Sequence, residues 1–451
     1  MAGASPIDVP SWIDRQKVSP LQIAIACVCG AAVMLDGFDA QIIGFVAPTL
    51  IEEFKIAPAA LATTFSAGLF GILAGCLVLA PLADWVGRRW IIIVSVAIFA
   101  VATLLTARID TLQELTILRF ITGVGLGACM PNALALTSEY APARLRGTLT
   151  AWMFTGFSLG ALLGGMLAAQ LIPYFGWRPL FVAGGVLPLV LMLIMIVFLP
   201  ESVRHLAAKG KSSKRIAAIL NRIHPDPSVT PTSSFLINEE YRSGFTVAHL
   251  FDEGRAVGTI TLWAMFFLML LNLFLLASWT PTVLAAAGLP RQTAVFIGAM
   301  QQAGSVIATI VLGPLFDRIG FYRSLVPLLI ASALGILMMG AAGVGLSVTV
   351  IAAMFAGAGV MGGQVAMAVF AGAFYPTYIR ATGVGWCLGI GRVGAIIGPL
   401  IGGWMVANQW APREIFMVAA VPPIVVALLL LFMRSRTTVR ASGSEAPIGA
   451  Q

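Results

Sequence analysis

Charged side chains are scarce in this chain: they make up 10% of its 451 residues, whereas 59% of the residues are hydrophobic. An ordinary soluble domain has about 25% charged residues, so the composition excludes a soluble globular protein. Histidine is rarer still, and the three residues, His205, His224 and His249, fall together in one polar stretch. No Ser/His/Asp set and no metal-ligand spacing is present, so we expect neither an enzyme nor a metal site.

Cysteine is also sparse, and its spacing indicates neither a disulfide framework nor a metal site. All five cysteines fall inside long apolar runs, where we expect them to act as small packing residues; they are Cys27, Cys29, Cys76, Cys129 and Cys387. The first 20 residues lack the positively charged start of a cleavable signal. They are therefore expected to remain as a lead-in to the first apolar run.

The apolar residues form long continuous runs instead of the alternating pattern of membrane barrels. About 20 mostly apolar residues are needed for a helix to cross roughly 30 Å of hydrocarbon. Twelve such runs predict an all-α membrane protein with twelve transmembrane helices, at 21–48, 61–81, 89–107, 114–138, 148–171, 179–199, 257–284, 293–313, 324–343, 348–374, 382–407 and 413–433.

The net charge of +8 does not point to nucleic acid, because the basic residues follow membrane topology. The predicted outer loops contain Lys55, Arg108, Arg178 and Arg291, Arg413 starts the last span from the same side, and most of the other Lys and Arg residues lie on the opposite side. This bias is the positive-inside pattern. It predicts a multi-pass protein of the bacterial inner membrane with both termini in the cytoplasm.

The two halves of the chain repeat each other. Asp84 opens a turn after span 2, and Asp317 opens a similar turn 233 positions later, after span 8. A second landmark, Arg144 after span 4, returns at Arg380 with nearly the same offset. Parallel repeats of this kind build many transporters. We predict six-helix bundles at 1–200 and 256–436, a basic cytoplasmic linker at 201–255 and a disordered tail at 437–451.

Three short motifs carry a family resemblance. The turn Asp84-Trp85-Val86-Gly87-Arg88-Arg89 resembles the loop 2–3 signature of the major facilitator superfamily, with Pro81 where that signature usually has Gly. The run from Arg119 through Gly123, Gly125 and Gly127, and Pro200-Glu201-Ser202 after span 6, resemble two further signatures. The resemblance implies the superfamily's fold, with two pseudo-symmetric six-helix bundles.

Other segments resemble a narrower family, the aromatic acid:proton symporters, which includes 4-hydroxybenzoate, protocatechuate and benzoate transporters. They are Ile7-Asp8-Val9, Asp36-Gly37-Phe38-Asp39, Ser278-Trp279-Thr280-Pro281, Gly391-Arg392-Val393-Gly394 and Gly398-Pro399. The resemblance implies import of an aromatic carboxylate with protons, with the proton gradient as the energy source and no cofactor. The expected partners are this acid, protons and the lipid bilayer, with no nucleic acid, and the chain is expected to work as a monomer.

Two alternatives remain within the same superfamily. One is a proton symporter for a non-aromatic organic acid or dicarboxylate, and the other is a proton-driven exporter. Drug antiporters of the superfamily typically have a Gly-Pro pair in span 5, where this chain has Gly160-Ala161, which disfavours a drug antiporter. A membrane sensor would need an output domain for which little chain remains.

Four ionisable residues fall deep within the predicted spans: Asp36, Asp39, Arg119 and Arg392. Each costs about 2.5 to 3.5 kcal/mol on insertion scales, so a partner or a water-lined cavity is expected. Asp36 and Asp39 are three residues apart and lie near one helix face. Two carboxylates in a low dielectric cannot both ionise cheaply, so they are candidates for the coupling proton. The repeat offset of 233 maps Asp39 onto Asn272, so the second half keeps a polar residue without a titratable group there.

The two arginines suggest different roles. Arg119 can pair with an aspartate of span 1, or it can hold the substrate carboxylate; the first is favoured, so it is grouped with the proton-coupling residues. Arg392 lies near the middle of span 11, where transporter sites form. Its guanidinium can grip a carboxylate through two parallel hydrogen bonds, and the alternative is a structural role between helix ends.

Amides and aromatic rings inside the spans could complete a pocket for a hydroxylated ring, although aromatic residues in spans more often serve packing or face lipid. These candidates are Asn132, Asn272, Gln301, Gln302, Gln364, Trp152, Phe274, Trp279 and Trp386. Charges at the cytoplasmic helix ends form a candidate gate, with simple topology charge as the alternative. They are Asp84, Arg88, Glu139, Arg144 and Arg146 in the first half, and Asp317, Arg318 and Arg380 in the second.

Overall fold

In the computed structural model, the structure describes residues 7–209, 213–236, 248–252, 254–341, 345–375 and 379–443. Within these ranges, twelve helical segments are long and apolar enough to cross a membrane. The predicted all-helical class and the predicted number of spans are therefore confirmed. The chain is a multi-pass membrane protein.

Four of the first six spans are longer than the apolar runs that predicted them, and the third and sixth have the same length as their runs. The first six are α2 (Pro20–Glu53), a segment built from η1 (Pro58–Ala60), α3 (Leu61–Ala74), η2 (Gly75–Leu79), η3 (Ala80–Leu82) and α4 (Ala83–Val86), then α5 (Arg88–Thr106), α6 (Leu112–Tyr140), α7 (Ala143–Phe175) and α8 (Arg178–Phe198). The last six are α11 (Ala256–Ala286), α12 (Arg291–Ile319), α13 (Phe321–Met339), α14 (Leu346–Phe374), α15 (Arg380–Ala407), and the pair α16 (Pro412–Ala419) and α17 (Val421–Gly443).

Local sequence explains how these helices begin and where one of them breaks. Helix α6 starts at a capping box, in which Thr111 accepts from the Glu114 backbone and Glu114 accepts from the Thr111 backbone, a standard start signal. The second span changes to a π turn and then a 3-10 turn around Pro81. Proline has no N–H to donate and its ring crowds the carbonyl four residues earlier, so the regular helix ends there.

The same glycine turn occurs once in each half of the chain. Gly87 joins α4 to α5 with φ of 110°, and Gly320 joins α12 to α13 with φ of 88°. Positive φ is strained for residues with a Cβ, so glycine is favoured at both points. The two glycines are separated by the same 233 positions as Asp84 and Asp317, so the repeat has a structural counterpart.

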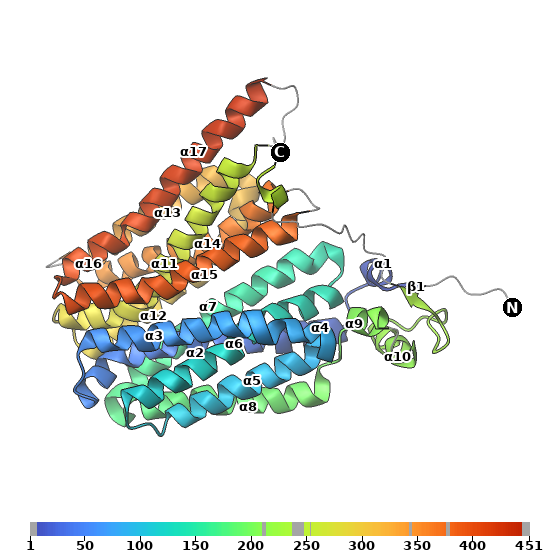
Figure 1. Ribbon diagram of the computed structural model, residues 1–451, viewed down its shortest axis with the longest axis horizontal. Coiled ribbons are helices and arrows are strands. Elements are labelled where there is room, and N and C mark those ends of the chain that lie inside the picture. The colour runs from blue at the N-terminus through green and yellow to red at the C-terminus, as the bar shows by residue number, and fades with distance from the viewer. Residues whose placement is uncertain are drawn as a thin grey trace. The chain divides into compact units, whose positions relative to one another are not determined.

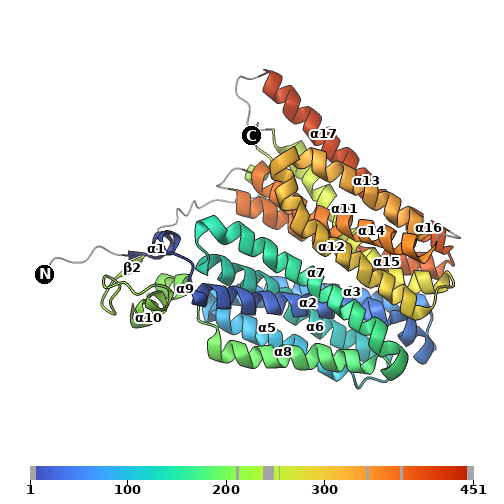
Figure 2. The same ribbon diagram turned by 180° about the vertical axis from the view of Figure 1, so that it is seen from behind.

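The chain divides into two compact units. Unit 1 comprises Met1–Ile42, Ala67–Gly164 and Tyr174–Tyr241, and unit 2 comprises Ile43–Ser66, Gly165–Pro173 and Arg242–Gln451. In unit 1, α5 packs against both α6 and α8 (Figure 2). In unit 2, α11 packs against α15, while α14 packs against α12 and α13 (Figure 1). Each unit has its own buried apolar core.

Short elements from the N-terminus and the linker fold together on unit 1. Strand β1 (Ile7–Asp8) pairs in parallel with β2 (Phe235–Leu236), and α1 (Val9–Arg15) lies beside α9 (Val203–Ala208) and α10 (Ser213–Ile223) (Figures 1 and 2). The Trp12 indole donates to Asp226 at 3.0 Å. Hydrogen bonds from Ser228 and Trp12 lower the pKa of Asp226. The described part of the predicted linker, which also holds η4 (Ala248–Leu250), is thus largely folded.

Helix α17 continues to Gly443, beyond the predicted start of the tail at residue 437. Residues 444–451 lie outside the described residues.

Candidate functional site

The acid–base group of unit 1 is centred on Asp39 of α2. Arg119 of α6 donates from Nη1 to Asp39 Oδ2 at 3.1 Å, and Thr103 of α5 donates to Asp39 Oδ1 at 2.6 Å. The Arg119 Nη2 atom lies 3.3 Å from the hydroxyl oxygens of both Thr103 and Thr106. Four side chains from three helices therefore form one network.

This network is closed to solvent. Arg119 is 4% exposed and Asp39 is 1% exposed, and the guanidinium carbon lies 5.2 Å from the centre of the Phe181 ring of α8. A buried ion pair is tolerated when further hydrogen bonds satisfy the remaining groups, and the two threonines supply them. Arg119 Nε is the exception, since it is buried and finds no hydrogen-bond partner in the described part of the chain.

Asp36 lies one helical turn before Asp39 and is also buried, at 4% exposed. Between them, Gly37 faces the backbone of α7 so closely that an added Cβ would lie 2.0 Å from the Phe157 carbonyl oxygen. Helix α2 can approach α7 this closely only because residue 37 has no side chain. Both predicted proton-coupling carboxyls therefore lie in the packed interior of unit 1, and the structure brings Arg119 to Asp39.

In unit 2, Arg392 lies on α15 and is partly buried. Among the described residues, no hydrogen-bond or ion-pair partner of its guanidinium is found. The neighbouring glycines bring α15 against α11: an added Cβ at Gly394 would lie 2.2 Å from the Phe267 carbonyl oxygen, and one at Gly398 would lie 2.3 Å from that of Leu271. Within the part of the chain that the structure describes, Arg392 is thus a cation without a counter-ion, beside a tight helix pair.

Asn272 lies on α11, one residue after Leu271, and is fully buried. Its Nδ2 and Oδ1 atoms both lack hydrogen-bond partners in the described part of the chain. On α14, Gln364 is partly buried, and its Oε1 atom likewise has no partner there. Leaving such groups unpaired typically costs about 1–3 kcal/mol each. Unit 2 therefore contains amide groups that can form hydrogen bonds with a bound ligand.

The other predicted pocket residues of unit 2 differ in their surroundings. Gln301 and Gln302 are buried, and Phe274 is partly buried. Trp279 is buried, and its indole donates to the Pro399 carbonyl at 2.9 Å, which is a packing contact between α11 and α15. Trp386 is 42% exposed and stacks on Trp263.

Two predicted pocket residues belong to unit 1. Asn132 of α6 is buried and donates to the Ala128 carbonyl one turn earlier, at 2.9 Å. Its amide nitrogen is therefore already used by the backbone. Trp152 of α7 is 75% exposed, so the structure does not place it with the acid–base group.

The predicted gate of the first half separates into two clusters. Arg88 forms an ion pair with Glu139, which also accepts from the Ser202 hydroxyl at 2.5 Å. This cluster joins the start of α5 to the end of α6 and to the loop after α8. Asp84 is exposed, and among the described residues no bonding partner is found for its carboxylate.

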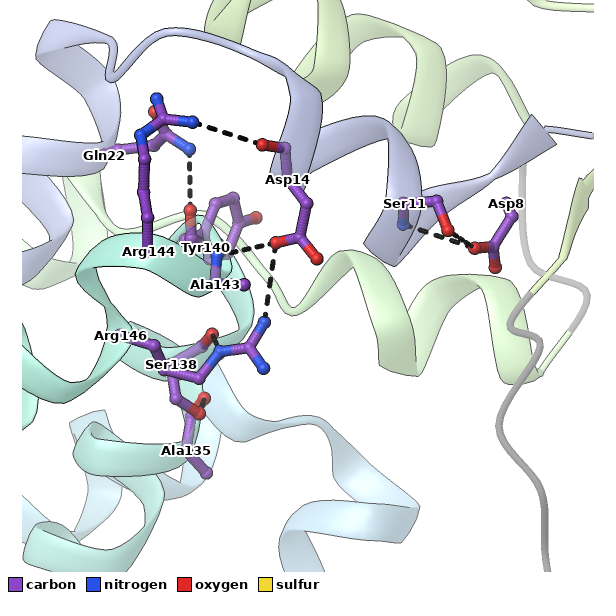
Figure 3. A network of polar contacts seen from close by, with 10 residues as sticks. All are labelled: Asp8, Ser11, Asp14, Gln22, Ala135, Ser138, Tyr140, Ala143, Arg144 and Arg146. Carbon is purple, nitrogen blue, oxygen red and sulfur yellow. Dashed lines mark hydrogen bonds and ion pairs between the residues drawn. The ribbon is translucent and has the colours of Figure 1, made fainter. Parts of the chain in front are cut away.

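Arg144 and Arg146 instead contact the N-terminal segment (Figure 3). Arg144 donates to the carbonyl oxygen of Asp14 at 3.2 Å, as Figure 3 shows. It also donates to the carbonyl oxygen of Gln16 at 2.8 Å. Arg146 donates to the Ser138 carbonyl and lies 3.8 Å from the Asp14 carboxylate, which also accepts from the Ala143 backbone at 2.7 Å. The carboxylate of Asp14 therefore caps the start of α7.

In the second half, Arg318 is exposed, and the side chains of Asp317 and Arg380 lie outside the described residues. Among the residues that are described, no group of three His, Cys, Asp or Glu side chains could hold a metal ion.

Sequence reasoning missed several polar and aromatic partners. Thr103 and Thr106 are three residues apart, on one face of an apolar span, and this spacing was the available signal. Phe181 carried no signal, because phenylalanine is common in any membrane helix. The contacts of Asp14 were also not predictable from local sequence, because its partners are separated from it by about 130 residues along the chain.

Comparison with known proteins agrees with this architecture. The model of the Major Facilitator Superfamily matches residues 29–304 and 262–450. The chain is 38% identical over 437 residues to the 4-hydroxybenzoate transporter PcaK of Acinetobacter baylyi, covering 96% of this chain and 95% of the relative. It is also 38% identical over 431 residues to a gallate transporter of Pseudomonas putida, with 95% of both chains covered.

Among solved structures, the inward open conformation of the xylose transporter XylE from E. coli aligns with a TM-score of 0.71. The sequences are 18% identical, and the alignment covers 91% of this chain and 96% of that one, so this similarity supports the fold alone. The family match and the full-length relatives together show that this chain is not an enzyme but belongs to the Major Facilitator Superfamily, in its aromatic-acid transporter group.

Proposed function

We propose that this chain imports an aromatic carboxylate together with protons by alternating access. It would act as a monomer in the bacterial inner membrane, with both termini in the cytoplasm. The relatives named for 4-hydroxybenzoate and gallate support the substrate class. The observation that carries the proposal is a contrast: unit 1 holds a closed acid–base pair, whereas unit 2 holds a cation and amide atoms for which no partner is found among the described residues.

The pair in unit 1 suits proton coupling. With Asp39 ionised, Arg119 has its counter-ion, and the network is neutral. When Asp39 takes up a proton, Arg119 keeps its charge, because arginine does not deprotonate in proteins. The uncompensated charge then favours binding of an anion in the low dielectric of the protein interior. Proton uptake would thereby raise the affinity for a carboxylate substrate, which is the coupling that a symporter needs.

The groups in unit 2 suit the substrate. Arg392 can form two parallel hydrogen bonds with a carboxylate, and the amides of Asn272 and Gln364 offer both donors and acceptors. Ring hydroxyls, such as those of 4-hydroxybenzoate and gallate, can donate to the amide oxygens and accept from the nitrogens.

Uptake of radiolabelled 4-hydroxybenzoate and gallate into cells expressing the chain tests the proposal. We expect accumulation that a protonophore abolishes. Uptake of non-aromatic acids alone would overturn the substrate class, and substrate extrusion would overturn the direction of transport.

Arg392→Lys tests the substrate residue. Lysine keeps the positive charge but cannot form the bidentate pair, so we expect the uptake efficiency to fall roughly 10- to 100-fold, as for the loss of one charge-assisted hydrogen bond. Arg413→Lys is the matched control, because Arg413 is exposed at the start of α16. Equal uptake by the two variants would remove Arg392 from the substrate site.

Asp39→Asn and Asp36→Asn test the proton. A carrier that mimics the protonated state should still exchange external for internal substrate, but it should not accumulate substrate against its gradient. Asp110→Asn, at a residue whose side chain is 88% exposed, should behave as the unmodified protein. Normal proton-driven accumulation in both test variants would refute the coupling role.

A further inference from the structure

A cavity of about 570 Å³ lies in unit 1, apart from the acid–base group. It opens where the turn between α4 and α5 meets the segment after α8 and helices α9 and α10, which lie close together in Figure 1. The polar and aromatic residues that line it are Arg89, Trp90, Glu201, His205, Arg215 and Arg222. Positive charge and one large ring therefore share a single cavity.

Helix α10 supplies the exposed part of this charge. Its apolar residues Ile216, Leu220 and Ile223 are buried, whereas Arg215 and Arg222 are exposed. These arginines are seven residues apart, about two helical turns, and so lie on the same face of the helix. The apolar face attaches α10 to unit 1, while the arginine face borders the cavity.

Arg89 supplies the inner part of the charge. Its Nη2 donates to the Ile196 carbonyl at 2.6 Å, which orients the guanidinium. In the described part of the chain, its Nε atom is buried without a hydrogen-bond partner. Glu201 offsets only part of the charge, and its Oε1 atom already accepts from the backbone N–H groups of Arg89 and Ser202. Three guanidinium groups thus face one carboxylate.

The rim of the cavity is apolar and exposed. Trp90 is 47% exposed, and Val86, which also lines the cavity, is 54% exposed. Trp85, beside Val86 on α4, is 75% exposed. Tryptophan is enriched at the level of lipid headgroups, and exposed apolar side chains of a membrane protein contact acyl chains. A small water-soluble anion would make no use of this rim.

We propose that this cavity binds the phosphate headgroup of an anionic phospholipid. Basic pockets on the cytoplasmic side of membrane proteins bind such headgroups, and guanidinium matches phosphate geometry through paired hydrogen bonds. Arg215 and Arg222 hold the phosphate from α10, Arg89 holds it from α5, and the acyl chains lie along Val86 and Trp90. The bound lipid would tie the linker helix to the membrane-spanning bundle.

Native mass spectrometry of the purified full chain tests this site, with phosphatidylglycerol, cardiolipin and phosphatidylcholine as probes. We expect the two anionic lipids to bind, and the double variant Arg215→Gln/Arg222→Gln to bind them at least about tenfold more weakly. The matched control is Lys214→Gln/Lys17→Gln, which removes the same charge at two exposed residues outside the cavity. It should retain the affinity of the unmodified chain.

Unchanged affinity in the arginine double variant, or equal binding of phosphatidylcholine, would overturn the proposal. Inorganic phosphate serves as a competitor: failure to displace the lipid supports a lipid site, whereas displacement at comparable concentration assigns the cavity to a soluble phosphate. Without added lipid, all variants should have the same melting temperature. If the arginine double variant melts at a lower temperature, the single variant Arg222→Lys is tested in its place. That variant keeps the charge, and an affinity equal to that of the unmodified chain would then count against guanidinium recognition.

Discussion

The Asp39–Arg119 pair allows a quantitative test of the acid–base group. Asp39→Asn keeps an acceptor for the Thr103 hydroxyl but leaves Arg119, which is 4% exposed, without a counter-ion. Removing one partner of a buried ion pair costs about 3–5 kcal/mol, because the remaining charge is stranded in a low dielectric. Arg119→Gln should cost less, since an aspartate can take up a proton when it loses its cation, whereas arginine keeps its charge.

The double variant Asp39→Asn/Arg119→Gln strands no charge, and its two amides can bond to each other. We therefore expect it to be less destabilised than Asp39→Asn alone, with a coupling free energy of about 2–4 kcal/mol between the two residues. The free energy of unfolding of all four proteins is measured by reversible unfolding in mixed detergent micelles, followed by tryptophan fluorescence.

The surface pair Asp110–Arg178 provides the control for this cycle. Its atoms are 3.6 Å apart, and its side chains are 88% and 44% exposed, so its coupling should stay below about 1 kcal/mol. Effects of Asp39→Asn and Arg119→Gln that add within about 0.5 kcal/mol would show that the two residues do not stabilise each other. The proposed coupling between proton and anion would then lose its physical basis.

Three further variants test single features of the structure. Asn272→Leu removes two buried polar atoms that have no partner among the described residues, so it should raise the free energy of unfolding by about 1 kcal/mol while abolishing the rise in melting temperature on adding substrate. Gly160→Ala would place a Cβ 1.7 Å from a carbonyl oxygen of α2, so it should lower the free energy of unfolding, measured by chemical denaturation, by about 1–3 kcal/mol. In the control Gly30→Ala the new Cβ has nothing within 4 Å, so the free energy of unfolding should change little. Asp14→Ala removes the cap of α7, worth about 1 kcal/mol, and should speed tryptic cleavage after Lys17 about fivefold, while Asp14→Asn, which keeps an acceptor, should speed it less.

The fold was predictable because hydropathy alone determines where a chain can cross a membrane. The twelve runs, the positions of the turns and the repeat offset all follow from residue type and spacing. The linker was less predictable: 201–255 was read as basic connecting chain, yet α10 buries Ile216, Leu220 and Ile223. An amphipathic helix of 11 residues is too short for a membrane span, and its partners near the N-terminus cannot be identified from local pattern.

Within the site, the burial of the ionisable residues was predictable from the sequence, but their bonding partners were only partly predictable. Scarcity singled out Asp36, Asp39 and Arg119, because ionisable residues in a span need partners, and pairing of Arg119 with one of the two aspartates was favoured without a choice between them. The roles of Arg144 and Arg146 were less accessible. Their contacts with Asp14 (Figure 3) depend on how the N-terminal segment folds back onto the bundle. The hydropathy of the sequence does not indicate this path.

The sequence repeat accounts for the difference between the two units in the hydrogen bonding of their buried polar groups. The offset of 233 residues pairs Asp39 with Asn272, but it pairs Arg119 with Ala352, a buried apolar residue. In unit 2, the amide of Asn272 therefore stands at the position that corresponds to Asp39, and an apolar residue stands at the position that corresponds to Arg119. The reverse holds for Arg392, which the offset of 236 between Arg144 and Arg380 pairs with Gly156, a residue without charge. Of the two arginines deep within the spans, Arg119 has an acid in reach, whereas none is found for Arg392 among the described residues. A closed pair can respond to a proton, whereas a cation without a counter-ion can respond to an anion. The two proposed tasks would thus divide between the units according to which of two repeat-related positions carries a charge.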